Sequence, residues 1–167
     1  TGEVMALVNR PSVNPNNRSD LKDEHYRNRA ITDLFEPGST IKPFTIAAAL
    51  ESGIYTPDSI IDTSPGIFKI DSHDVTDEKN YGRLDLGGIL EKSSNIGASK
   101  IALSLDPELL WQVFRDCGFG SLSEVMLPGE ANGRLKSYPN WRQLDQGVLA
   151  YGYGVSVTAI QLARAYM

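Results

Sequence analysis

The sequence has very little cysteine and no excess of basic residues. Its single cysteine, Cys117, excludes a disulfide within the chain. The 16 Lys and Arg residues are outnumbered by 21 Asp and Glu residues, which gives a net charge of -5. Because nucleic-acid-binding domains usually carry a basic face, we predict no nucleic-acid partner.

Long apolar runs and metal-binding patterns are also missing. No stretch of about 18 apolar residues occurs, so no transmembrane helix is predicted. The start of the chain shows no signal-peptide pattern. The two histidines, His25 and His73, lie in polar loops without partners at metal-ligand spacing. We therefore expect neither a metal nor a cofactor.

The composition is that of an ordinary globular protein, with 41% hydrophobic and 22% charged residues over 167 positions. This length suits one domain or a piece of one. A capping box of Thr158 and Gln161 starts a helical pattern that continues to Met167 without a stop signal. We expect residues 1–167 to be one part of a domain, truncated at both ends.

Apolar periodicity and turn residues predict a mostly helical chain with one clear strand, at Val4–Val8. Residues 11–24 are rich in Asn, Pro and Ser and predict a loop, and "GIFKI" indicates a small hairpin. The predicted helices are Ser39–Gly53, Leu84–Lys92, Asn95–Leu105, a helix opened by Asp106-Pro107 and stopped by Gly118, Gln143–Ala150, and the helix that starts at Thr158. The fold class is therefore α+β.

The segment "FEPGSTIKPF" places a serine and a lysine at the start of an apolar helix. Residues i and i+3 lie about 60° apart around a helix, so Ser39 Oγ and Lys42 Nζ can meet. Apolar surroundings lower the pKa of a lysine, so that Lys42 can be neutral and act as a base. Free N–H groups at a helix start also stabilise a developing oxyanion.

A simpler interpretation of this pair stays open at this point, in which Ser39 caps the helix and Lys42 reaches solvent. The pattern Ser-x-x-Lys is short, and Ser19 to Lys22 matches it in a polar loop. We interpret that second match as noise.

A second polar cluster, Ser93-Ser94-Asn95, stands between two apolar helices. A serine hydroxyl can relay a proton, and an asparagine amide can hold a lysine and donate to a substrate carbonyl. Helix capping explains the same residues equally well. Ser12-Val13-Asn14 repeats the pattern in a loop and is interpreted as a decoy.

Four long blocks resemble the transpeptidase domain of penicillin-binding proteins, and most closely the class B, division-specific, penicillin-binding protein 3 type. They are "TGEVMALVNRPSVNPNN", "FEPGSTIKPF", "LGGILEKSSNIGASKIAL" and "GYGVSVTAIQLARAY". The resemblance implies that Ser39 is the acylated nucleophile and Lys42 its general base. It makes Ser93 and Asn95 the S-x-N motif, with Ser94 between them at the substrate-binding site.

The resemblance also implies the substrate, the partners and the location. The substrate would be a peptidoglycan stem peptide ending in D-Ala-D-Ala, and β-lactams would trap Ser39. The remainder of the transpeptidase domain and division-complex proteins would be partners, at the periplasmic face of the bacterial inner membrane.

The third motif of the family, Lys-Thr-Gly or Lys-Ser-Gly on a central strand, is absent from this sequence. We therefore expect the mostly helical portion of a penicillin-binding, serine-transpeptidase fold, with the central sheet largely missing. The chain alone is expected to be inactive. Two alternatives are a serine β-lactamase, which needs a deacylation base of the type Glu-x-x-Leu-Asn that is not found, and a penicillin-sensing or scaffolding domain.

Two further expectations concern residues near these motifs. Tyr151 and Tyr153 in "YGYG" can flank a cleft but are more readily interpreted as scaffold. Glu36 is predicted to brace its loop by pairing with Arg27 or Arg29.

Overall fold

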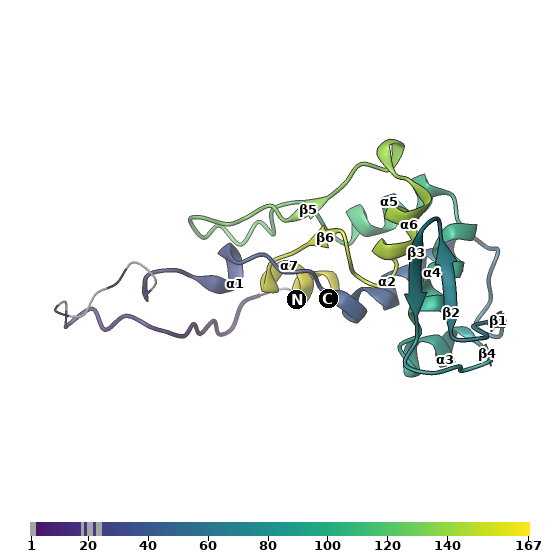
Figure 1. The fold of residues 1–167 in the computed structure, drawn as a ribbon. Coiled ribbons are helices and arrows are strands. Elements are labelled where there is room, and N and C mark those ends of the chain that lie inside the picture. Colours follow the sequence, from purple (N-terminus) through teal and green to yellow (C-terminus); the bar gives the residue numbers. More distant parts are fainter. Residues whose placement is uncertain (1–2, 18, 20–21, 23–24) are drawn as a thin grey trace.

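The computed structural model describes residues 3–17, 19, 22 and 25–167. Helices α2 to α6 gather at one end of the molecule together with a β-hairpin (Figure 1). The N-terminal segment and the segment between α5 and β5 extend away from this helical group, with α1 and α7 between them and the helices. The molecule thus consists of a helical body, formed by α2 to α6 and the hairpin, and two extended segments.

The regular elements are short. The helices are α1 (Arg29–Thr32), a 3-10 turn η2 (Gly38–Ile41), α2 (Lys42–Glu51), α3 (Leu86–Glu91), α4 (Asn95–Ser104), α5 (Pro107–Asp116), a 3-10 turn η3 (Tyr138–Asn140), α6 (Gln143–Leu149) and α7 (Ala159–Ala165). The strands are β1 (Ile61–Asp62), β2 (Ile67–Ile70), β3 (His73–Thr76), β4 (Arg83–Leu84), β5 (Arg134–Leu135) and β6 (Val155–Ser156).

In the described part of the chain, the strands form three separate antiparallel pairs, β1 with β4, β2 with β3, and β5 with β6. The hairpin β2–β3 pairs Ile67 with Thr76 and Ile70 with His73, so only two residues form its turn. Ile70 and Val75 are buried against the helices, whereas most of their neighbours along the strands are exposed. The hairpin therefore covers the helical body with one face.

Helices α2 and α4 pack against each other in the core. Both helices carry small residues on their buried sides, and Ala48, Ala49, Ala98 and Ala102 are fully buried. Small side chains allow the two helix backbones to approach closely. This close approach brings the N-terminal ends of α2 and α4 together, which positions the functional side chains described below.

Most of the predicted helices are confirmed, with shifts at their ends. The helix predicted at Ser39–Gly53 begins as the 3-10 turn η2 and becomes α-helical at Lys42. The helix predicted from Leu84 starts two residues later, because Leu84 pairs with Ile61 in a strand and Asp85 caps the helix instead. The hairpin at "GIFKI" and the capping box of Thr158 and Gln161 are also confirmed.

The strand predicted at Val4–Val8 is wrong. Residues 3–9 have no regular secondary structure, and Met5 and Val8 are 89% and 84% exposed. An apolar run forms a strand only when a neighbouring strand supplies hydrogen bonds, and none of the strands in the described residues pairs with this segment. The fold class is nevertheless α+β as expected.

Gln146 on α6 links this helix to the C-terminal end of α4 through side-chain hydrogen bonds. Its Nε2 donates to Ala102 O at 2.7 Å and to Leu105 O at 3.0 Å, at the end of α4, and the side chain is buried. Gln146→Leu should lower the free energy of unfolding by about 1–3 kcal/mol, because a buried carbonyl loses its donor.

Urea denaturation checks this value. The matched control is Gln112→Leu on the exposed side of α5, which should change stability by no more than about 0.5 kcal/mol. Equal denaturation midpoints for both variants would contradict the assigned role of Gln146.

Candidate active site

Two polar segments meet where the starts of α2 and α4 come together. The first is η2 with the first residue of α2, which carries Ser39 and Lys42. The second is the link between α3 and α4, which carries Ser93, Ser94 and Asn95. They are separated by about 50 residues of sequence, and their side chains are in direct contact.

Lys42 is the centre of this contact. Its Nζ lies 2.9 Å from Ser39 Oγ, 2.8 Å from Ser93 Oγ and 2.8 Å from Asn95 Oδ1. It also donates to the backbone carbonyl of Ser93 at 2.6 Å. The predicted contact between Ser39 and Lys42 is confirmed. The structure also shows that Ser93 and Asn95, from the second polar cluster, contact the same amine.

Ser39 and Lys42 differ in their access to solvent. Ser39 is exposed, whereas Lys42 is only 1% exposed. Burial lowers the pKa of Lys42 to about 8, and the charge of Asp77 opposes this shift. The neutral amine, which can accept a proton, is therefore far more populated near neutral pH than in an ordinary lysine.

The contacts of Nζ fit a neutral amine as well as an ammonium group. Nζ has four oxygen neighbours, and either form makes three hydrogen bonds: an ammonium group donates three, and a neutral amine donates two and accepts one. A neutral amine can donate to the Ser93 carbonyl and to Asn95 Oδ1, and it then accepts a proton from a hydroxyl. Ser93 Oγ also lies 2.9 Å from Ser39 Oγ, so the two hydroxyls and the amine form a closed triangle.

Ser93 adopts a backbone conformation that is uncommon for a residue with a side chain. Its φ is +54°, in the left-handed region. In this conformation both its carbonyl oxygen and its hydroxyl reach Lys42. Strained residues of this kind are concentrated at functional sites, where surrounding contacts hold them in place.

Asn95 is oriented by a second contact. Its Nδ2 donates to the carbonyl of Thr76 on β3 at 3.1 Å, which leaves Oδ1 facing Lys42. An amide nitrogen carries two hydrogens, so one remains available for a substrate carbonyl.

The structure places Ser94 away from the other four side chains. It is fully buried, its hydroxyl donates to Asp77 Oδ2 at 2.6 Å, and it caps α4 by accepting from the amide of Gly97. Ser94 therefore holds the start of α4 and has no access to a substrate.

Asp77 is a functional residue that sequence reasoning missed. Its Oδ1 accepts from the backbone amides of Asn95 and Ile96 at 2.6 and 3.1 Å, while its Oδ2 accepts from Ser94. Asp77 follows β3 in a segment with several acidic residues, and no spacing distinguishes it from the others. Only the docking of the hairpin on α4 shows that this carboxylate holds the Ser93–Asn95 segment.

A groove of about 350 Å³ lies beside Asn95. Its other walls include Thr76, Val148, Tyr151 and Tyr153. The two tyrosine rings pack edge to face with centroids 5.4 Å apart, and Tyr153 is 52% exposed. Both tyrosines thus flank a groove next to the site, in addition to their contribution to packing.

The pairing predicted for Glu36 is wrong. Arg27 and Arg29 both form ion pairs with Asp33, at 2.7 and 3.1 Å. The carboxylate of Glu36 instead accepts from the backbone amide of Gly154 at 2.9 Å. A charged partner is already bound to both arginines, and Gly154 lies opposite Glu36 because the two segments pack together.

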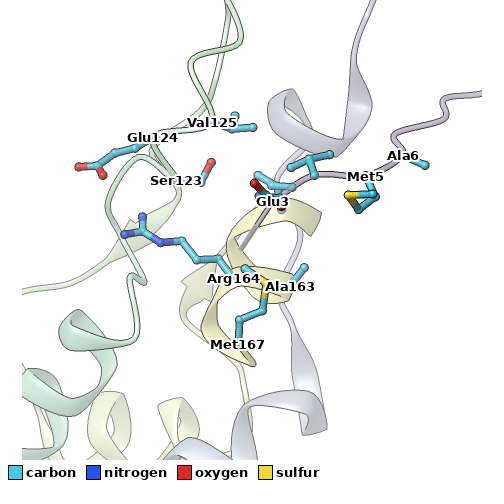
Figure 2. Close-up of a pocket in the computed structure, with 11 residues that line it drawn as sticks. Glu3, Met5, Ala6, Ser123, Glu124, Val125, Ala163, Arg164 and Met167 are labelled. Carbon is cyan, nitrogen blue, oxygen red and sulfur yellow. The ribbon is translucent and has the colours of Figure 1, made fainter. Parts of the chain in front are cut away.

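A second groove, of about 440 Å³, lies between the N-terminal segment, residues 123–125 and α7 (Figure 2). It is lined mainly by apolar groups, including Met5, Val125 and Met167, and by none of the side chains around Lys42. Within the described residues, no group of three His, Cys, Asp or Glu side chains is suited to hold a metal ion. No helix in that same part of the chain is long and apolar enough to cross a membrane.

Known proteins match this chain over almost its whole length. It is 43% identical over 166 residues to a probable peptidoglycan D,D-transpeptidase PenA of Neisseria flavescens, and 42% identical over 166 residues to the peptidoglycan D,D-transpeptidase FtsI of Escherichia coli. These alignments cover 99% of this chain but only 41% and 28% of the respective relatives. The chain therefore spans less than half the length of either relative.

Solved structures agree with the sequence matches. The fold is similar to that of a protein described as a peptidoglycan glycosyltransferase from Burkholderia ambifaria, with a TM-score of 0.89, 45% identity, and coverage of 99% of this chain and 48% of that one. It is also similar to the transpeptidase domain of penicillin-binding protein 3 from Burkholderia pseudomallei, with a TM-score of 0.82, 47% identity, and coverage of 84% and 42%.

The family model for the penicillin binding protein transpeptidase domain matches residues 1–167. Together with the arrangement of Ser39, Lys42, Ser93 and Asn95 around one buried amine, this match shows that the chain belongs to the penicillin-binding protein transpeptidase domain family.

Proposed function

We propose that this chain carries the nucleophile and the proton-transfer groups of a peptidoglycan D,D-transpeptidase, and that it works as part of a longer transpeptidase domain. The observation that carries this proposal is the buried Lys42 amine in contact with Ser39, Ser93 and Asn95. The names of the relatives and the family match support the same reaction.

In the first step, neutral Lys42 takes the proton of Ser39 Oγ, and Oγ attacks the carbonyl carbon between the two D-Ala residues of a stem peptide. The negative charge moves to the carbonyl oxygen. The backbone N–H of Ser39 lies at the start of a helical turn, where amides lack helical partners, and is suited to stabilise this oxyanion. One N–H of Asn95 is free to hold another carbonyl of the donor peptide.

In the second half of acylation, the C–N bond breaks and the terminal D-Ala leaves as an amine. Its nitrogen needs a proton, which Lys42 gives back through the Ser93 hydroxyl, 2.8 Å from Nζ. Ser39 is then an ester of the donor peptide. An acceptor amine from a neighbouring stem attacks this ester, forms the cross-link and releases Ser39 Oγ, which regains its proton. β-Lactams would acylate Ser39 by the same route.

Hydrolysis of the acyl-enzyme, which would make the protein a β-lactamase, needs a base that activates water. In the described residues, no carboxylate is hydrogen-bonded to Ser39, and the nearest one in the network, Asp77, is bound to Ser94 and to backbone amides. This arrangement favours a long-lived acyl-enzyme. A penicillin-sensing or scaffolding role predicts the same labelling but no transfer to an acceptor amine.

The partners and the location are part of the same proposal and are implied by the family resemblance. The substrate-binding strand with the third motif would come from the remainder of the domain. The cell-division assembly would be the partner, and the periplasmic face of the inner membrane the location, as for a cell-wall enzyme of the FtsI type.

Labelling with a fluorescent penicillin tests the nucleophile. The protein that carries the complete domain should be labelled stably, and Ser39→Ala should abolish labelling because it removes the hydroxyl at the start of the helical turn, where the oxyanion-stabilising amide lies. Ser93 Oγ also contacts Lys42, but in this proposal it only relays a proton. The matched control is Ser19→Ala, which removes the loop serine of the second Ser-x-x-Lys match and should leave labelling unchanged. Rapid loss of the label would favour a β-lactamase, and labelling of Ser39→Ala would refute the assignment.

The pH dependence of acylation tests the base. Because the neutral form of Lys42 is the active one and its pKa is about 8, the acylation rate constant should rise as the pH increases from 6 to 8 and level off above that value. Lys42→Ala should reduce the rate constant about 10²- to 10⁴-fold. A pH-independent rate constant over this range would exclude Lys42 as the base.

Asp77→Asn separates the electrostatic and structural effects of that residue. The charge of Asp77 raises the pKa of Lys42, so its removal should shift the midpoint of the pH–rate profile to lower pH. The amide oxygen of the Asp77→Asn side chain can still accept the hydrogen bond from the backbone N–H of Asn95. Its NH2 group, however, cannot accept the hydrogen bond that Ser94 donates to the carboxylate. The measurement is stopped-flow acylation between pH 5.5 and 9, and an unchanged midpoint would contradict the coupling.

A further inference from the structure

The short segment that leads into Ser39 is held by the segment after α6. Phe35 and Val157 exchange two backbone hydrogen bonds of 3.0 and 2.9 Å as an isolated antiparallel bridge. Three residues further along, the amide of Gly38 donates to the carbonyl of Gly152 at 3.2 Å. The backbone that carries the nucleophile is therefore fastened to residues 152–157 on both sides of Glu36.

The contact between Gly38 and Gly152 leaves no space for a side chain. A Cβ atom on Gly152 would lie 2.0 Å from the carbonyl oxygen of Gly38, well inside van der Waals distance. Both glycines have positive φ values, +57° and +93°. Any displacement of the turn at 151–154 is thus passed directly to Gly38, and Ser39 is the next residue.

One side chain ties this turn to the nucleophile segment. Glu36 Oε1 accepts from the amide of Gly154 at 2.9 Å, across 118 residues of sequence. Glu36 is exposed, and the nearby arginines are paired with Asp33. Because Asp33 occupies both arginines, the hydrogen bond from Gly154 is the contact that the Glu36 carboxylate makes across the two segments.

We propose that Glu36 is a positioning residue for acylation. By holding the amide of Gly154, it keeps the turn at 151–154 against Gly38, and this fixes the Ser39 amide and Oγ relative to Lys42. The same turn carries Tyr151 and Tyr153, which line the groove beside Asn95. The Glu36–Gly154 hydrogen bond thus joins the nucleophile segment to one wall of that groove. This inference rests on the proposed function of Ser39.

The test measures the acylation rate constant with a fluorescent penicillin, in the protein that carries the complete domain, separately from the affinity of the initial complex. Glu36→Ala should reduce the rate constant about tenfold or more, since small displacements of reacting groups cost rate steeply. Glu36→Gln should stay within about threefold of the parent value, because its amide oxygen can still accept from Gly154. Because Glu36 is exposed, the melting temperatures of Glu36→Ala and Glu36→Gln should equal that of the parent protein.

Two further variants define what a different role would look like. Glu51→Ala removes an exposed glutamate at the end of α2, for which no side-chain hydrogen bond or ion pair is found among the described residues, and should not change the rate constant. Gly152→Ala should reduce the rate constant as Glu36→Ala does, with a lower melting temperature because of the clash with Gly38.

The outcomes distinguish this inference from the proposed function. If Glu36→Ala is acylated with the parent rate constant, Glu36 does not position Ser39. The same conclusion holds if the amount of labelled protein falls while the rate constant stays unchanged. Equal losses in Glu36→Gln and Glu36→Ala would also overturn the inference, because the hydrogen bond would then not be the cause. If the parent protein itself is not labelled at Ser39, the proposed function fails instead.

Discussion

The structure depends on one constraint, which is that the amine of Lys42 lies in the core and must be surrounded by oxygen atoms. A buried lysine loses the hydration that favours its charge, so it needs hydrogen-bond partners, and its pKa falls. Four oxygens meet this need, one from Ser39 in the preceding turn and three from Ser93 and Asn95, which are 51 and 53 residues away. The packing of α2 on α4, both of which carry buried alanines, places these groups within reach. The same burial that makes the lysine costly lowers its pKa to about 8.

A second layer of contacts holds the residues around Lys42 in place. Asp77, at the end of the β2–β3 hairpin, binds the backbone at the start of α4 and the buried hydroxyl of Ser94. On the other side, the turn at 151–154 touches Gly38 directly. Both supports come from short segments that connect larger elements, and both act on backbone atoms. The reacting side chains can therefore have the strained geometry seen at Ser93 without losing their positions.

The chain matches only part of its relatives and carries two of the three motifs expected from the resemblance. Its relatives are longer, and this chain spans 41% of one and 28% of another. It contains the residues that we propose as nucleophile and base and the S-x-N residues, but no Lys-Thr-Gly or Lys-Ser-Gly motif. Three two-stranded pairs in the described residues do not form a central sheet. The contacts around Lys42 are thus formed by the helical part together with the hairpin that packs on it.

The sequence by itself determined the features that depend on neighbours within about four positions. Helix α4, the start of α5 after Asp106, the capping box at Thr158 and the contact of Ser39 with Lys42 all follow from local spacing and were predicted. Tertiary structure decided the features that depend on distant partners. The segment Val4–Val8 has strand-forming residues but no neighbouring strand, Asp77 acts on residues 17 to 19 positions further along the chain, and Glu36 binds an amide 118 positions away. Helix geometry fixes where a side chain points relative to its own turn, but only the packing of α2, α4 and the hairpin fixes which distant group it meets.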